Sequence, residues 1–172
     1  STLDRSSAAS DVYKRQFVRQ KATHELFRNI EKLRQLSGGK PVGFKLCIGH
    51  PWEWFAMVKA MQTTGLWPDF IVVDGAEGGT GAAPLEFTDH VGAPLQEGLL
   101  LVHNTLVGIG ERHRVKLGCS GKVVSAFDIA RMMALGADWC NSARGFMFAL
   151  GCIQAQSCLL YTSDAADERS SV

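Results

Sequence analysis

Short apolar runs alternate with longer amphipathic stretches along most of the chain. The apolar runs have the length typical of buried strands and cover residues 42–48, 69–73, 114–120 and 137–143. The amphipathic stretches predict helices over residues 22–36, 52–64, 94–107, 125–136 and 145–156. Strands that alternate with helices at this spacing indicate parallel βα units.

Polar or glycine-rich residues follow each predicted strand, namely Lys45 with His50, then residues 74–80, 120–122 and 141–145. In (β/α)8 barrels, functional groups lie at the carboxyl ends of the strands, with a phosphate site after strands seven and eight. The last two loops each precede a predicted helix N-terminus, which favours a phosphate. The pattern therefore predicts an α/β fold that is the C-terminal half of a (β/α)8 TIM-type barrel, rather than a doubly wound sheet. Half a barrel exposes strand edges, so we expect it to be unstable alone.

The loop after the second strand, residues 74–84, is rich in glycine. It is not a phosphate-binding P-loop, because Ala82 rather than lysine follows Gly81. It is not a dinucleotide fingerprint either, because Pro84 stands where the third glycine belongs. Such a loop lets the backbone approach a ligand closely, and the alternative is a purely structural turn.

The net charge of +1 and the 46% content of hydrophobic residues describe an ordinary globular chain without a basic stripe for nucleic acid. Apolar runs are far shorter than the roughly 20 residues that a membrane span needs. The five cysteines lack the dense spacing of a secreted disulfide scaffold, which predicts a cytoplasmic protein.

The two ends of the chain are related as DNA. Residues 6–16 back-translate into a sequence whose reverse complement encodes residues 158–168, and this DNA resembles the transposon-end adapter of sequencing libraries. We interpret residues 1–16 and 158–172 as adapter-derived and non-native, so they carry no information about the fold. Residues 17–157 are then a metagenomic gene fragment that carries the second half of the barrel.

Three segments carry a family resemblance: residues 40–53, 70–106 and 116–158. Their motifs are Asp-Gly-Ala-Glu-Gly-Gly-Thr-Gly-Ala-Ala-Pro at 74–84, Ser-Gly-Lys at 120–122 and Asn-Ser-Ala-Arg-Gly at 141–145. Together they resemble the FMN-binding domain of the glutamate synthase family, and more closely its stand-alone members.

The resemblance implies an FMN-dependent oxidoreductase that acts on CH–NH2 donors in glutamate biosynthesis. Electrons from ferredoxin or a pyridine-nucleotide subunit would pass through a [3Fe-4S] cluster and FMN to 2-iminoglutarate, formed from 2-oxoglutarate and ammonia, and yield L-glutamate. The fragment itself is expected to be inactive. The alternatives are another FMN-barrel oxidoreductase of amino or oxo acids, and a flavin electron-transfer or regulatory module without turnover.

The resemblance also assigns the reacting site. Lys45 would face the barrel mouth as a catalytic cation that stabilises the anionic reduced flavin or a substrate carboxylate. The alternative is a lysine that points outward between helices. Glu77 would be a polar positioning group rather than a general base, and the substrate would bind Gly78, Gly79, Thr80 and Gly81.

FMN would be held at its phosphate and ribityl chain by two loops: Ser120, Gly121, Lys122, Ser142, Ala143, Arg144 and Gly145. Two helix N-termini and an arginine suit a dianionic monoester. Taken without its loop, Arg144 is equally well explained as half of a surface ion pair.

Glutamate synthases carry their cluster on a Cys-x5-Cys-x4-Cys motif, and Cys152 with Cys158 reproduces the first spacing. The third cysteine is missing, so this chain as given is expected to bind no cluster. The histidines have no metal-ligand spacing, and the four tryptophans are predicted to pack in the core: Trp52, Trp54, Trp67 and Trp139.

Overall fold

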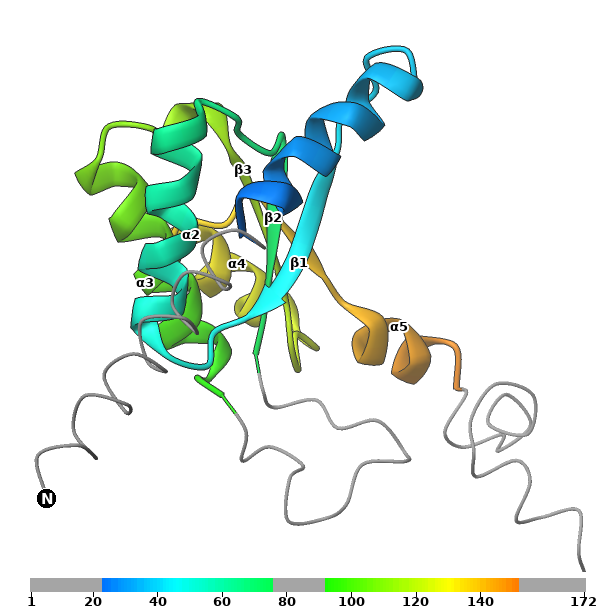
Figure 1. The fold of residues 1–172 in the computed structure, drawn as a ribbon. Helices are drawn as coiled ribbons and strands as arrows, with labels where there is room; N and C mark the ends of the chain where they lie inside the picture. Colours follow the sequence, from blue (N-terminus) through cyan, green and yellow to red (C-terminus); the bar gives the residue numbers. More distant parts are fainter. Residues whose placement is uncertain (1–22, 76–91, 152–172) are drawn as a thin grey trace, which may run out of the picture.

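The structure, a computed structural model, describes residues 23–75 and 92–151. Its centre is a parallel sheet of four strands: β1 Gly43–Cys47, β2 Phe70–Asp74, β3 Lys116–Ser120 and β4 Trp139–Asn141. The strands lie in the order in which they follow along the chain (Figure 1). A doubly wound sheet reverses its order partway, whereas this order is compatible with part of a TIM-type barrel. The prediction of an α/β fold is confirmed.

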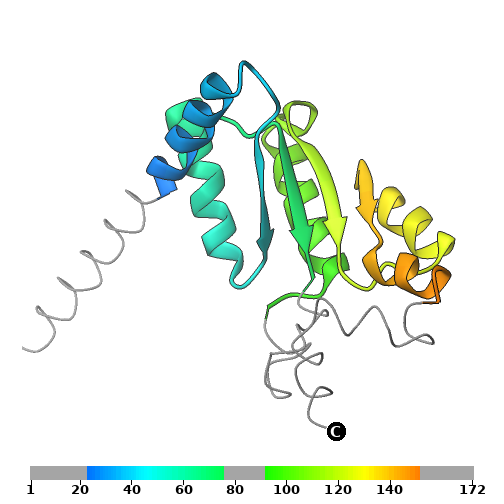
Figure 2. The ribbon, with the colours of Figure 1, turned by 90° about the vertical axis from the view of Figure 1, so that its right-hand side faces the viewer.

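Helices connect the strands, after a first helix over residues 23–36. They are α2 Pro51–Thr64, α3 Leu95–Gly108, α4 Ala126–Ala134 and α5 Ala143–Ala149, with a 3-10 turn at Arg112–Arg114. α2 and α3 lie on the same side of the sheet (Figure 1), and α3 packs on β2 and β3 while α4 packs on β4. With the strands seen face-on, α3 lies behind them, the first helix and α2 lie toward the β1 edge, and α4 and α5 lie at the β4 edge (Figure 2).

Side chains that alternate along the strands separate a helix-covered face from a helix-free face. Ile71, Val73, Leu117 and Cys119 are fully buried against the helices. A methyl group added to Gly98 of α3 would lie 3.4 Å from Val73 Cγ1, so this helix packs closely on the sheet. The intervening residues of each strand therefore point to the opposite face, which is not covered by α2, α3 or α4.

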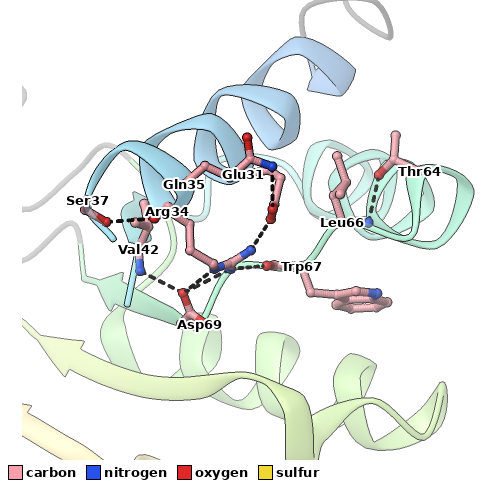
Figure 3. A network of polar contacts seen from close by, with 9 residues as sticks. All are labelled: Glu31, Arg34, Gln35, Ser37, Val42, Thr64, Leu66, Trp67 and Asp69. Carbon is pink, nitrogen blue, oxygen red and sulfur yellow. Dashed lines mark hydrogen bonds and ion pairs between the residues drawn. The ribbon is translucent and has the colours of Figure 1, made fainter. Parts of the chain in front are cut away.

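Asp69, one residue before β2, fastens the amino end of β1 to β2 (Figure 3). Its backbone N–H donates to the Val42 carbonyl at 2.9 Å, and its carboxylate accepts from the Val42 N–H at 2.7 Å. Arg34 of the first helix donates to the same carboxylate at 3.0 and 3.1 Å and to the Trp67 carbonyl at 2.8 Å. One side chain thus pins a helix and two strands together.

Asp138, one residue before β4, repeats this arrangement. Its N–H donates to the Leu117 carbonyl at 2.7 Å, and its carboxylate accepts from the Leu117 N–H at 2.7 Å. Arg112 donates to the carboxylate at 2.8 Å and to the carbonyls of Val115 and Gly136, each at 2.8 Å. Burial acts to raise the pKa of Asp138, but the hydrogen bonds from Leu117 and Arg112 outweigh it and hold that pKa below its usual value. We call the two arrangements the aspartate clamps.

Several predicted boundaries shift. β3 begins at Lys116 rather than 114, because residues Arg112–Arg114 form the 3-10 turn that brings Arg112 into its clamp. α5 begins at Ala143 and ends at Ala149, and Gly151 follows in the left-handed region at φ 66°. The prediction of a helix over residues 145–156 is therefore wrong at both ends. Residues 152–156 lie outside the described residues.

The prediction that all four tryptophans pack in the core is only partly correct. Trp54 and Trp67 are buried. Trp52 is 59% exposed and stacks on His50, with ring centroids 4.1 Å apart. Trp139 lies on the helix-free face, in edge contact with Phe70.

Replacing either clamp aspartate with alanine is expected to lower the free energy of unfolding by about 1–3 kcal/mol, because a backbone N–H and an arginine lose their acceptor. Denaturant titration of Asp69→Ala and Asp138→Ala measures this loss. The control is Glu111→Gln, which removes an exposed ion pair to Arg114 and should cost less than about 1 kcal/mol. Equal effects in all three variants would contradict a special role for the clamps.

Candidate functional site

A row of polar side chains lines the carboxyl ends of the strands on the helix-free face. Strand register pairs Cys47 with Asp74, Asp74 with Ser120, and Ser120 with Asn141. Two residues earlier along each strand, Lys45 pairs with Val72, which pairs with Gly118. Because residues paired in this register share a face, these side chains form one surface.

Lys45 and Asp74 form an ion pair on this surface. The Lys45 side chain is 57% exposed and that of Asp74 is 25% exposed. Lys45 thus lies on the helix-free face and not between helices, which excludes the alternative orientation considered from the sequence. Burial, and then the nearby Asp74 carboxylate, raise the pKa of the Cys47 thiol, so Cys47 stays protonated near neutral pH.

The floor beneath the polar row is apolar. Gly118 leaves room for the Trp139 ring, which a methyl group at position 118 would overlap. Trp139 meets Phe70 in an edge-on contact with centroids 6.0 Å apart. Polar groups that rim an apolar floor are typical of sites for small organic ligands.

The turn after β3 has a strained backbone. Gly121 has φ 140°, and Lys122 has φ 47°, a conformation that non-glycine residues seldom adopt. Lys122 is the one non-glycine residue with positive φ in residues 23–75 and 92–151. Strain of this kind is concentrated where a loop serves a ligand. The same turn walls an open cavity of about 260 Å³, which is lined by Leu95, Gln96, Gly121, Lys122, Val123, Asp128, Arg131 and Met132.

The two loops predicted to hold FMN touch each other. The Ser142 hydroxyl donates to the Val123 carbonyl at 2.7 Å. A methyl group added at Gly145 would lie 2.5 Å from Ser142 Oγ and 2.7 Å from the Val124 carbonyl oxygen. Glycine at position 145 is thus required for the close approach of the loops. The structure therefore brings Val123 and Val124, which directly follow Ser120, Gly121 and Lys122, against Ser142 and Gly145 at the start of α5.

The N-terminus of α4 is already occupied, contrary to the reasoning that assigned an anion to both helix N-termini. Ser125 and Asp128 form a capping box, in which the Asp128 N–H donates to Ser125 Oγ at 3.2 Å. The Asp128 carboxylate accepts the N–H groups of Ser125 and Val124 at 2.9 and 3.3 Å. In contrast, the Ser142 side chain leaves the start of α5 uncapped because its hydroxyl is directed to Val123. Of the two helices, the start of α5 is therefore the better place for an anion.

Some predicted site residues lie outside the described residues: Glu77, Gly78, Gly79, Thr80, Gly81, Cys152 and Cys158. Arg144 lies in α5, one residue after its start. In residues 23–75 and 92–151, no group of three metal-ligating side chains comes together. The Sγ atoms of Cys119 and Cys140 lie 3.3 Å apart, and burial, together with that contact, raises the pKa of Cys119 to about 12.

The sequence analysis placed Asp74 and Asn141 in the polar segments that follow the strands, but it assigned neither residue a role in the site. The signal was available, because each residue ends an apolar run just as Ser120 does. Aligning the ends of the four strands would have placed Asp74 and Asn141 in the same row.

The chain matches the family described as "Conserved region in glutamate synthase" over residues 14–165. The glutamate synthase large subunit-like protein YerD of Bacillus subtilis is 47% identical over 82% of this chain and 27% of its own length. The archaeal-type glutamate synthase [NADPH] of Thermotoga neapolitana is 36% identical over 81% of this chain and 28% of its own. Ferredoxin-dependent glutamate synthase 1 of Arabidopsis thaliana is 39% identical over 52% of this chain and 6% of its own.

The fold and the polar row define an α/β protein with a row of polar side chains at the carboxyl edge of a parallel sheet. The chain belongs to the glutamate synthase family, which confirms the resemblance seen in the sequence. It spans about a quarter of the length of the first two relatives. Within the part of the chain that the structure describes, no helix is long and apolar enough to cross a membrane.

The Asp128 capping box is expected to weaken in acid. Hydrogen bonds from the backbone and side chain of Ser125, and then from Val124, lower the pKa of Asp128 from 3.8 to about 2. A carboxyl whose folded-state pKa is depressed contributes stability above its unfolded pKa, and that stability is lost as pH falls through the folded value. Thermal denaturation should therefore show the wild type more stable than Asp128→Asn at neutral pH, with a gap that closes between about pH 4 and pH 2. A gap independent of pH would contradict this assignment.

Proposed function

We propose that this chain is part of an FMN-dependent oxidoreductase of the glutamate synthase type, which reduces 2-iminoglutarate, formed from 2-oxoglutarate and ammonia, to L-glutamate. Membership of the family supports the reaction class. The observation that carries the proposal is the contact between the turn after β3 and the start of α5, beside a polar row that contains Lys45.

The residues present fit the flavin. Gly145 has no side chain where one would separate the two loops, and the Gly121–Lys122 turn is held in an unusual backbone conformation. Backbone N–H groups of this turn and of the start of α5 would hold the phosphate, with Ser120, Ser142, Ala143 and Arg144 beside them. FMN would supply hydride and electron transfer when bound.

Lys45 would place a positive charge beside the isoalloxazine ring. A cation at this position favours an anionic reduced flavin and also suits a substrate carboxylate. The apolar floor of Val72, Gly118 and Trp139 would exclude water from one side of the ring. Residues 78–81 and Glu77 complete the proposed substrate site, with Glu77 as a positioning group.

The names of the relatives, which include NADPH-dependent and ferredoxin-dependent enzymes, support a ferredoxin or a pyridine nucleotide as the proposed electron donor. We propose that Cys152, with further cysteines of the intact protein, ligates a [3Fe-4S] cluster that passes electrons from such a donor. A ferredoxin or a pyridine-nucleotide subunit would serve equally well by this chemistry.

The full-length protein is expected to purify with FMN rather than FAD, because the backbone N–H groups of the two loops would bind the phosphate of FMN as a terminal monoester. Arg144→Ala should weaken FMN binding about ten- to a hundredfold through the loss of a charge-assisted hydrogen bond worth about 1.5–3 kcal/mol. The matched control is Arg114→Ala, since Arg114 packs on Trp67 at the opposite end of the sheet and should leave FMN binding unchanged. Chromatography of the released flavin and titration of the apoprotein measure both effects.

A measurement of L-glutamate formation distinguishes the proposed reaction from a flavin module without turnover. Protein that binds FMN and forms L-glutamate from 2-oxoglutarate and ammonia, with reduced ferredoxin or NADPH, supports it. Flavin binding without glutamate formation from either donor would contradict the proposed reaction and favour a flavin module without this activity. Equal loss of FMN in Arg144→Ala and Arg114→Ala would contradict the location of the phosphate.

A further inference from the structure

The two acids that flank β2 have different partners. Asp69, just before the strand, binds a backbone N–H and an arginine in its clamp. Asp74, at the end of the strand, pairs with Lys45 of β1, and within the part of the chain that the structure describes its carboxylate has no hydrogen bond to the backbone. The backbone at this point is held independently, because the Gly75 N–H donates to the Ser120 carbonyl at 2.8 Å.

The Lys45–Asp74 pair contributes little to stability. The two side chains are 57% and 25% exposed, and ion pairs with such exposure are typically worth about 0–1 kcal/mol. The pair also lies in the polar row of the proposed site, with neutral neighbours Ser120 and Asn141. The protonated Cys47 adds no charge. Among the strand residues Lys45, Cys47, Asp74, Ser120 and Asn141, the lysine and the aspartate thus carry the charge.

We propose that Asp74 is the counter-charge of Lys45 and limits how much positive charge reaches the bound flavin. This inference rests on the proposed function, because it takes Lys45 to lie beside the flavin ring. The carboxylate also holds the flexible lysine side chain at the strand ends, where two strands present both groups on one face. Asp74 is therefore a positioning residue that acts through Lys45, and it sets the reduction potential rather than carrying out a chemical step.

The inference predicts the order of the flavin reduction potentials in the wild type, the two single variants and the double variant. Removing the cation in Lys45→Met should lower the flavin potential, because the anionic reduced form loses its stabilising charge. Removing the counter-charge in Asp74→Asn should raise the potential, because the lysine charge is no longer offset. The double variant removes both charges and should lie between the two single variants, close to the wild type. If Asp74 had only a structural role, Asp74→Asn would change the free energy of unfolding and leave the flavin reduction potential unchanged.

Asp69→Asn is the matched control for Asp74→Asn. It makes the same substitution at the other end of the same strand, about 16 Å away at 3.3 Å per residue. That separation is roughly twice the screening length at physiological salt. Asp69→Asn should therefore leave the potential of the flavin at its wild-type value while it lowers stability.

The experiment is spectroelectrochemical titration of the full-length flavoprotein and its variants, together with labelling of the apoprotein by an amine-reactive sulfonate. Labelling of Lys45, followed by mass spectrometry, should accelerate about two- to fivefold in Asp74→Asn, which is the effect expected for an exposed ion pair. Bound flavin with a potential in Asp74→Asn equal to or below that of the wild type would overturn the inference and leave the proposed function standing. Equal labelling rates would overturn it as well. A wild-type protein that takes up no FMN would overturn the proposed function and the inference with it.

Discussion

Strand register at the amino ends of the sheet is the constraint on which the rest of the structure depends. Side chains alternate between the two faces of a strand, so a slip by one residue would move Lys45, Asp74 and Ser120 to the helix-covered face. The aspartate clamps prevent this slip. Asp69 binds both backbone groups of Val42, the residue just before β1, Asp138 binds those of Leu117 in β3, and an arginine donates to each carboxylate. Because each clamp binds one particular residue at the start of the neighbouring strand, it fixes the pairing of the whole strand.

The two ends of the sheet therefore have different tasks. At the amino end, the carboxylates of Asp69 and Asp138 accept hydrogen bonds from a backbone N–H and an arginine, and these contacts stabilise the fold. The carboxyl end holds Lys45 and Asp74, the strained Lys122 and the glycine-dependent contact of Gly145. These features add little to stability, and several of them carry a conformational cost. Such a division between a stabilising and a functional end is the rule in parallel βα proteins.

Much of this architecture could be predicted from the sequence. The alternation of apolar runs and amphipathic stretches predicted every described strand and helix, and Ser125 with Gly136 correctly bounded α4, because capping is a local property. The expected orientation of Lys45 came from the family resemblance, because a lysine within an apolar run could also point outward between helices. Features that depend on tertiary contacts were not predicted: the clamps, the partner of Lys45, the exposure of Trp52 and the place of Trp139 on the helix-free face. The prediction of an anion at the α4 N-terminus was wrong because the Asp128 carboxylate already accepts the N–H groups there. The helix dipole favours a negative charge at this point, but it does not distinguish a ligand from a side chain of the helix itself.

A crystal structure of the full-length protein with its flavin tests the central claim most directly. The account predicts a closed barrel in which the FMN phosphate lies within hydrogen-bond distance of the Gly121–Lys122 turn and of the start of α5. The isoalloxazine ring should lie on the helix-free face, beside Lys45 and above Gly118. A phosphate bound at the amino ends of the strands, or a ring located away from Lys45, would contradict the account.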